Sequence, residues 1–212
     1  MPSPEILMTF TLACALVIVS QGPDNILAIG RGLSQGKIAA LITSAAAATG
    51  LLVHVAAATL GLAVIIQTSQ TAFFVVKLIG AGYLIWLGAK AILSRNLISF
   101  NATDRLPLRS IFWTGFLTNV LNPKPAIFIL AFILAFIPQF ISVEGDAMGQ
   151  QMFVLGAWFA LMAFVIFAVL GRSTTVVAGW FERNPRSVFA LNIGAGLALV
   201  GAGISVIAMD RK

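Results

Sequence analysis

The amino-acid sequence predicts an all-α membrane protein of six transmembrane helices in a 3+3 inverted repeat. The composition is the first observation, because 59% of the 212 residues are hydrophobic and 9% are charged, against roughly 25% charged in an average soluble domain. The second observation is segment length, since a helix needs about 20 apolar residues to cross a bilayer core. Six segments reach this length, at residues 5–30, 38–66, 72–94, 110–141, 150–171 and 187–209.

The third observation is a pair of helix breaks one hundred positions apart. Gly22 and Pro23 interrupt the first segment, and Asn122 and Pro123 interrupt the fourth. With three helices in each half, the second repeat, about 110–209, runs through the membrane upside down relative to the first, about 5–94. Inverted repeats with paired interrupted helices are typical of transporters whose substrate site lies near the bilayer midplane.

The first apolar segment is expected to be a retained helix and not a cleaved signal peptide. Residues 1–5 contain one acid and no Lys or Arg, whereas a signal peptide begins with a positively charged region. The apolar run that follows is also too long for a signal peptide. The six segments leave no room for a soluble domain, so residues 1–212 are expected to form a single transmembrane domain.

Basic residues predict the orientation, because cytoplasmic loops of membrane proteins carry an excess of Lys and Arg. The connections between helices one and two, three and four, and five and six share one face. That face receives Arg31, Lys37, Lys90, Arg95, Arg105, Arg109, Arg172, Arg183 and Arg186. It is therefore predicted to be cytoplasmic, with both termini periplasmic. The cations are scattered at helix ends and form no single patch, which argues against a nucleic-acid partner.

Each break deprives backbone carbonyls of their usual partners. Proline has no N–H, so Pro23 removes the donor that Val19 needs, and Pro123 does the same to Asn119. In lipid such carbonyls must face protein or water. We therefore expect the breaks to face one another across a small polar cavity that binds substrate, with the candidate binding residues Gln21, Gly22, Pro23, Asp24, Asn25, Asn119, Asn122, Pro123 and Lys124.

Two opposite charges stand at these breaks. Asp24 lies in the first turn after one break and Lys124 in the first turn after the other, and a charge near the bilayer centre costs at least about 2.5 kcal/mol on insertion scales. A zwitterion satisfies both, with its ammonium group towards Asp24 and its carboxylate towards Lys124. The alternative is a buried Asp24–Lys124 ion pair that locks the helices together, although such a pair is a poor source of net stability.

Small residues at helical spacing predict close helix packing. One such stripe carries Thr43, Ala47, Gly50, His54, Ala57 and Gly61, and another carries Ala190, Gly194, Gly201 and Ala208. His54 on the first stripe is either a proton relay or a hydrogen-bonding group between helices. The stripes fit helix contacts within one subunit or between two subunits, so both a monomer and a homodimer agree with the sequence.

An ordered series of motifs resembles the LysE/RhtB family. It comprises GPDN at 22–25, RGLSQG at 31–36, Gly50 with His54, KLIGAGYLIWLG at 77–88, NPK at 122–124 and PQF at 138–140. The resemblance covers nearly the whole chain and implies a bacterial inner-membrane exporter of amino acids or related metabolites, driven by the proton gradient. The family often has Thr-Pro-Gly-Pro where this chain has Ser20-Gln21-Gly22-Pro23, so the first break is expected to be milder.

The expected function is therefore secondary-active export from the cytoplasm by alternating access, with proton antiport through Asp24 and His54. An enzyme is not expected, because one Cys, one His and no acid cluster provide no redox or nucleophilic set. No cofactor and no metal site are expected either. An inorganic-cation exporter is one alternative, but it would need thiolate or multiple carboxylate ligands. A non-transporting membrane scaffold is the other.

Overall fold

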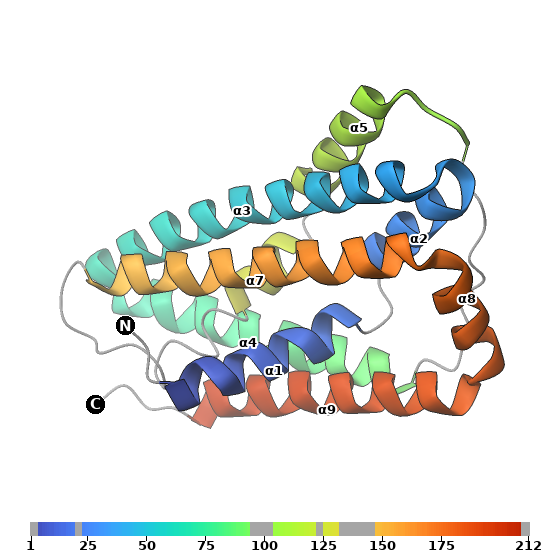
Figure 1. Cartoon of the computed structure of the whole chain (residues 1–212). Coiled ribbons are helices and arrows are strands. Elements are labelled where there is room, and N and C mark those ends of the chain that lie inside the picture. The colour runs from blue at the N-terminus through green and yellow to red at the C-terminus, as the bar shows by residue number, and fades with distance from the viewer. Residues whose placement is uncertain (1–3, 20–22, 94–103, 122–124, 132–146, 209–212) are drawn as a thin grey trace.

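The computed structural model describes residues 4–19, 23–93, 104–121, 125–131 and 147–208, and within these ranges every regular element is a helix (Figure 1). Residues 125–131 are helical. The other helices are α1 (Pro4–Val19), α2 (Pro23–Gln35), α3 (Lys37–Thr68), α4 (Gln70–Leu93), α5 (Leu108–Val120), α7 (Ala147–Arg172), α8 (Thr174–Arg183) and α9 (Pro185–Ala208).

Four of these helices are long and apolar enough to cross a membrane, at Lys37–Gly61, Thr71–Leu93, Gly149–Arg172 and Arg186–Ala208. The pair α1 and α2 is a fifth candidate span, and its two parts are bent by 57°. The chain is thus an all-helical membrane protein with four or five candidate spans among the described residues. The sixth span and the inverted repeat stay predictions, because residues 122–124 and 132–146 lie outside the described ranges.

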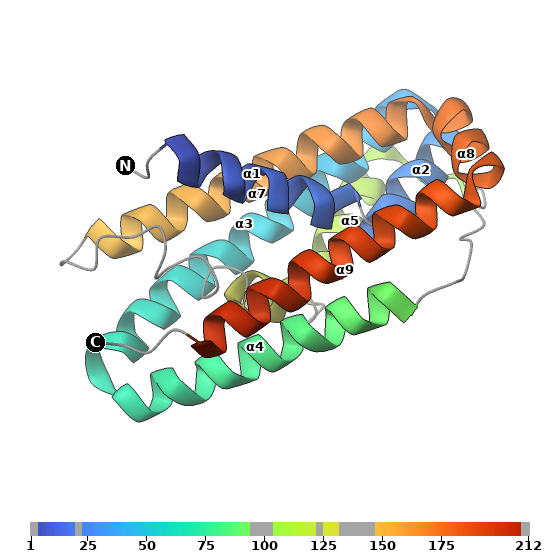
Figure 2. The ribbon, with the colours of Figure 1, turned by 90° about the horizontal axis from the view of Figure 1, so that it is seen from below.

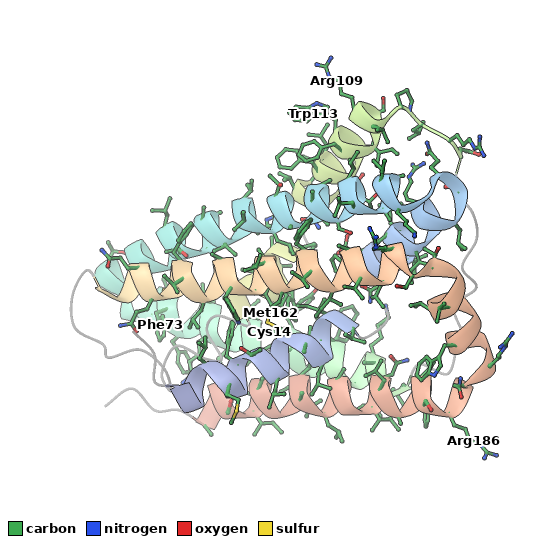
Figure 3. The ribbon with its side chains drawn as sticks, in the orientation of Figure 1. Cys14, Phe73, Arg109, Trp113, Met162 and Arg186 are labelled. Carbon is green, nitrogen blue, oxygen red and sulfur yellow. The ribbon has the colours of Figure 1, made fainter. Side chains whose placement is uncertain are left out.

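The helices pack mainly in two antiparallel pairs. α3 runs beside α7, and α4 runs beside α9, as Figure 1 and Figure 2 both show. α1 contacts both α7 and α9, while α2 and α5 pack against α3. A buried apolar cluster joins α1, α3, α4, α7 and α9, with Phe10, Cys14 and Leu84 among its buried members. Met162 of α7 packs against this cluster, and Figure 3 shows it beside Cys14.

Glycines bring the backbones of α4 and α9 into contact. A Cβ atom at Gly88 would lie 2.5 Å from the backbone oxygen of Gly196, and one at Gly203 would lie 2.8 Å from that of Ala81. Because no side chain stands at these positions, the two helices pack more closely than larger residues would allow. The contact face of α9 therefore contains Gly196 and Gly203, two turns apart.

The stripe predicted on α9 makes no contact within this subunit. Among the described residues no atom would lie within 4 Å of a Cβ at Gly194 or Gly201, and Ala190 and Ala208 are exposed. Its role in a contact between two subunits stays a prediction. Only the first part of the stripe predicted on α3 is buried within the subunit: Thr43, Ala47, Gly50 and His54 are buried, whereas Ala57 and Gly61 are exposed.

α8 is a helix that the sequence analysis treated as a connection. It lies across the ends of α7 and α9 (Figure 1), and its 10 residues are too few to span a bilayer. Val176 is 72% exposed and Trp180 is 46% exposed. A search for long apolar segments cannot find such a short helix.

Basic residues gather at the end of the bundle where α2 and α7 end, which we call the basic end (Figure 1). Lys37 begins α3, and Arg172 ends α7. Lys90 lies in the last turn of α4, and Arg183 lies in that of α8. Figure 3 shows Arg186 projecting from the same end. The opposite end, where α3 ends and α7 begins, is called the far end.

The backbone contact predicts that Gly196→Leu is destabilising. Overpacking a tight interface costs about 1–3 kcal/mol, and here the obstacle is backbone, which moves less easily than a side chain. We expect the detergent melting temperature to fall by several degrees. Gly201→Leu is the matched control on the same helix, because a side chain there meets open space. Equal melting temperatures for the two variants would contradict the packing described.

Candidate functional site

The first group of polar contacts lies between α1 and α2. Asn25 is 6% exposed in the first turn of α2. Its Nδ2 donates to the backbone oxygen of Ile18 at 2.9 Å and lies 3.5 Å from that of Val19. A continuous helix would pair these carbonyls with N–H groups four residues on. The carboxamide of Asn25 therefore takes the place of backbone donors.

Asp24 precedes Asn25 and is half-buried in the first turn of α2. A carboxylate is favourable there, because the helix N-terminus carries partial positive charge. Lys124, its predicted counterpart, lies outside the described residues together with Gln21, Gly22, Asn122 and Pro123, and the side chain of Pro23 is not described. Among the described residues, no three His, Cys, Asp or Glu side chains form a group that could hold a metal ion.

The second group of polar contacts lies between α3 and the end of α5. Nε2 of His54 is 3.0 Å from the backbone oxygen of Asn119, and both residues are buried, at 8% and 3% exposure. A carbonyl oxygen can only accept, so Nε2 must be the protonated nitrogen. This is the carbonyl for which Pro123 has no N–H to offer. His54 thus has the hydrogen-bonding role between helices, while its role as a proton relay stays a prediction.

The side chain of Asn119 is held against Gly50, one turn before His54 on α3. A Cβ atom at Gly50 would lie 2.6 Å from Oδ1 and 2.9 Å from Cγ of Asn119, so only glycine leaves room for the carboxamide. Neither Oδ1 nor Nδ2 of Asn119 has a hydrogen-bond partner among the described residues. An unpaired buried polar group costs about 1–3 kcal/mol, and such a group calls for an explanation such as a ligand or a water molecule.

The two groups of contacts are built in the same way but share no residue. In each, a side-chain donor from one helix meets a carbonyl at the end of another: Asn25 of α2 meets the end of α1, and His54 of α3 meets the end of α5. Both α2 and α5 pack against α3. The predicted cavity between the breaks stays a prediction.

Arg31 and Gln35 form a third group of contacts that the sequence analysis missed. Arg31 is 8% exposed, and its Nη1 donates to Oε1 of Gln35 at 3.2 Å and to the backbone oxygen of Asp104. Nε2 of Gln35 donates to the backbone oxygen of Leu106 at 2.7 Å, and the N–H of Leu106 donates back to Oε1 at 2.8 Å. This clamp ties the end of α2 to the segment leading into α5.

The motif RGLSQG supports the clamp through its last residue. Gly36 has a φ of 83°, a left-handed conformation that favours glycine. Its N–H donates to the backbone oxygen of Gly32 at 3.0 Å, which closes the last turn of α2. The chain then turns directly into α3. The motif could not predict that Arg31 is buried and hydrogen-bonded, because the clamp depends on a segment more than 70 residues away in the sequence.

These features define a helical membrane protein with polar side chains buried where its helices end inside the bundle. The comparisons with known proteins agree with this class. The chain belongs to the LysE type translocator family, because the sequence model of that family matches residues 15–210. No solved structure matches the chain.

Curated relatives cover almost the same length as this chain. The homoserine/homoserine lactone efflux protein of Salmonella typhimurium is 30% identical over 91% of this chain and 92% of its own length. The leucine efflux protein of Klebsiella pneumoniae is 26% identical over 92% and 91% of the two chains. The uncharacterized membrane protein YrhP of Bacillus subtilis is 28% identical over 93% and 96%.

The clamp predicts that Gln35→Met weakens the fold. The substitution keeps about the same length of side chain but removes both the donor that faces the Leu106 carbonyl and the acceptor that faces Arg31. Leaving a buried polar group unpaired costs about 1–3 kcal/mol, so the melting temperature is expected to fall. Gln150→Met is the matched control, because Gln150 is exposed. Equal melting temperatures for Gln35→Met and the wild type would show that the clamp contributes nothing.

Proposed function

We propose that this protein exports amino acids, or related small metabolites, from the cytoplasm by secondary-active transport. The family match and the relatives named for homoserine and leucine efflux support the class of substrate. The observation that carries the position of the site is the buried carboxamide of Asn119, which has no partner among the described residues. It lies beside His54 at the end of α5.

The proposed site takes an amino-acid zwitterion. Asn119 offers Oδ1 as an acceptor and Nδ2 as a donor, which fits a ligand that carries an ammonium group and a carboxylate. Asp24 adds a negative charge for the ammonium group, and Lys124 adds a positive charge for the carboxylate. The remaining proposed lining is Gln21, Gly22, Pro23, Asn25, Asn122 and Pro123. A direct Asp24–Lys124 ion pair is the alternative arrangement.

The proposed transport cycle is alternating access within a six-helix, 3+3 inverted repeat. We take the basic end as the cytoplasmic side, following the excess of Lys and Arg in cytoplasmic loops. α1 begins and α9 ends at the far end (Figure 1), so both termini are then periplasmic in a bacterial inner membrane. Whether two subunits associate as a homodimer stays open.

The proposed coupling ion is the proton, which enters as the amino acid leaves. Asp24 changes protonation at the first break, and His54 responds at the second. The hydrogen bond from His54 to the Asn119 carbonyl supports this role, because any movement of α5 against α3 must break it or carry the imidazole along. A proton taken up at Nδ1 and a change in helix packing at Nε2 are thereby linked through one imidazole ring.

Transport in reconstituted vesicles tests the proposal. The wild-type protein is expected to release preloaded labelled homoserine or leucine, and an inward proton gradient is expected to speed this efflux. Asp24→Asn and Lys124→Ala are expected to lower efflux at least tenfold with melting temperatures near that of the wild type. Asp104→Asn and Lys90→Ala are matched controls, because both residues are exposed at the basic end.

Two outcomes would contradict the proposal. Wild-type efflux in Asp24→Asn or Lys124→Ala would remove that residue from the mechanism. A wild-type protein that moves no amino acid and whose melting temperature responds to none would instead support the scaffold alternative.

A further inference from the structure

The short helix α8 carries an exposed face that combines apolar side chains with a cation. It lies across the ends of α7 and α9 (Figure 1). Val176, Trp180 and Arg183 are all exposed. Residues three or four positions apart lie on the same face of a helix, so these three side chains form one surface, which we call the outer face of α8.

The other side of α8 is fixed to the bundle. Thr174 is 7% exposed, and a Cβ atom at Gly32 of α2 would overlap its Cγ2, so α8 begins in close contact with α2. At the other end, the backbone N–H and Nδ2 of Asn184 donate to the backbone oxygen of Trp180, at 3.0 Å and 2.9 Å. These two hydrogen bonds close the last turn of α8. The outer face is therefore part of a helix that is held at both ends.

Cations flank the outer face. Arg172 ends α7, Arg183 ends α8, and Arg186 lies in the first turn of α9, and all three side chains are exposed. Glu182 is the one acid in the sequence from 172 to 186, so three Arg against one Glu give this stretch a net charge of +2. A helix that combines Trp on an apolar face with flanking Arg is typical of segments that lie in the plane of a membrane surface.

The depth of α8 also fits a lipid. The candidate spans Gly149–Arg172 and Arg186–Ala208 end directly on either side of it, which places α8 where the hydrocarbon of the bilayer gives way to headgroups. Tryptophan is enriched at that depth, because its ring is apolar and its N–H is polar. Guanidinium groups bind phosphate oxygens through paired, charge-assisted hydrogen bonds. Phospholipid headgroups therefore match the outer face in depth, polarity and charge.

We infer that the outer face of α8, together with Arg172 and Arg186, binds anionic phospholipids of the leaflet at the basic end. Val176 and Trp180 enter the boundary between headgroups and acyl chains, and the three Arg pair with phosphate. Because α8 links α7 to α9, which belong to different helix pairs, bound lipid stabilises the connection between the two pairs. The inference concerns this surface alone and does not rest on the export function.

Melting temperature in nanodiscs tests the inference. Adding phosphatidylglycerol to phosphatidylcholine discs is expected to raise the melting temperature by several degrees, because a ligand of the folded state stabilises it. The double variant Arg183→Gln with Arg186→Gln is expected to lose most of this rise and to melt with the wild type in phosphatidylcholine alone. An unchanged rise in the double variant would overturn the inference.

The matched control removes two other cations. Arg105→Gln with Arg109→Gln deletes the same charge from exposed residues, and Figure 3 shows Arg109 far from Arg186. This variant is expected to keep the rise caused by phosphatidylglycerol. An equal loss in both double variants would show an effect of net charge alone and would also overturn the inference.

Fluorescence quenching tests the position of the outer face. Val176→Cys labelled with nitrobenzoxadiazole is expected to be quenched roughly twofold more by phosphatidylglycerol with a spin-labelled acyl chain than by spin-labelled phosphatidylcholine. The native Cys14 is buried and does not compete for the label. Asp104→Cys is the control, because Asp104 is exposed in the segment before α5, and its label is expected to be quenched by aqueous iodide.

Two results of the quenching experiment would overturn the inference. Quenching of the Val176→Cys label by iodide and by neither lipid would place the outer face in water, within reach of a soluble protein partner. Equal quenching by the two spin-labelled lipids would show a membrane contact without preference for anionic headgroups.

Discussion

A helix that ends inside the bundle of a membrane protein must have its last carbonyls paired by something other than its own backbone, and this constraint organises the structure. Asn25 supplies the donor at the end of α1, and His54 supplies it at the end of α5. Because each donor comes from a different helix, each of these helix ends is also a point of contact between helices. Lipid offers no donor to a bare carbonyl, so such pairing has to come from the protein or from water.

α3 is the element on which these contacts converge. It presents His54 and Gly50 to α5 and Thr59 to α7, and it also packs against α2. The backbone contact of α4 with α9 is, by contrast, built from glycines, with the buried Asn192 one turn before Gly196. The bundle therefore combines one helix pair in close backbone contact with a second pair in which α3 carries Thr43, Ser44 and His54 as buried polar residues.

The sequence predicted the features that depend on local chemistry. Apolar length placed the segment 38–66 within two residues of α3 at each end, and the absence of an N–H in proline indicated which carbonyls would need donors. The contact face of α9 could not be predicted, because glycines occupy two of its faces and spacing alone does not tell which face meets α4. The clamp by Arg31 depends on a segment that is distant in the sequence, which no local pattern encodes.

The most direct test of this account is a nitrogen-15 NMR spectrum of the protein with labelled histidine, because His54 is the only histidine in the chain. If its ring donates to the Asn119 carbonyl, Nε2 carries a proton, and the neutral form of the ring is the Nε2–H tautomer. A neutral ring protonated only on Nδ1 would contradict the contact and, with it, the pairing of the carbonyl at the end of α5.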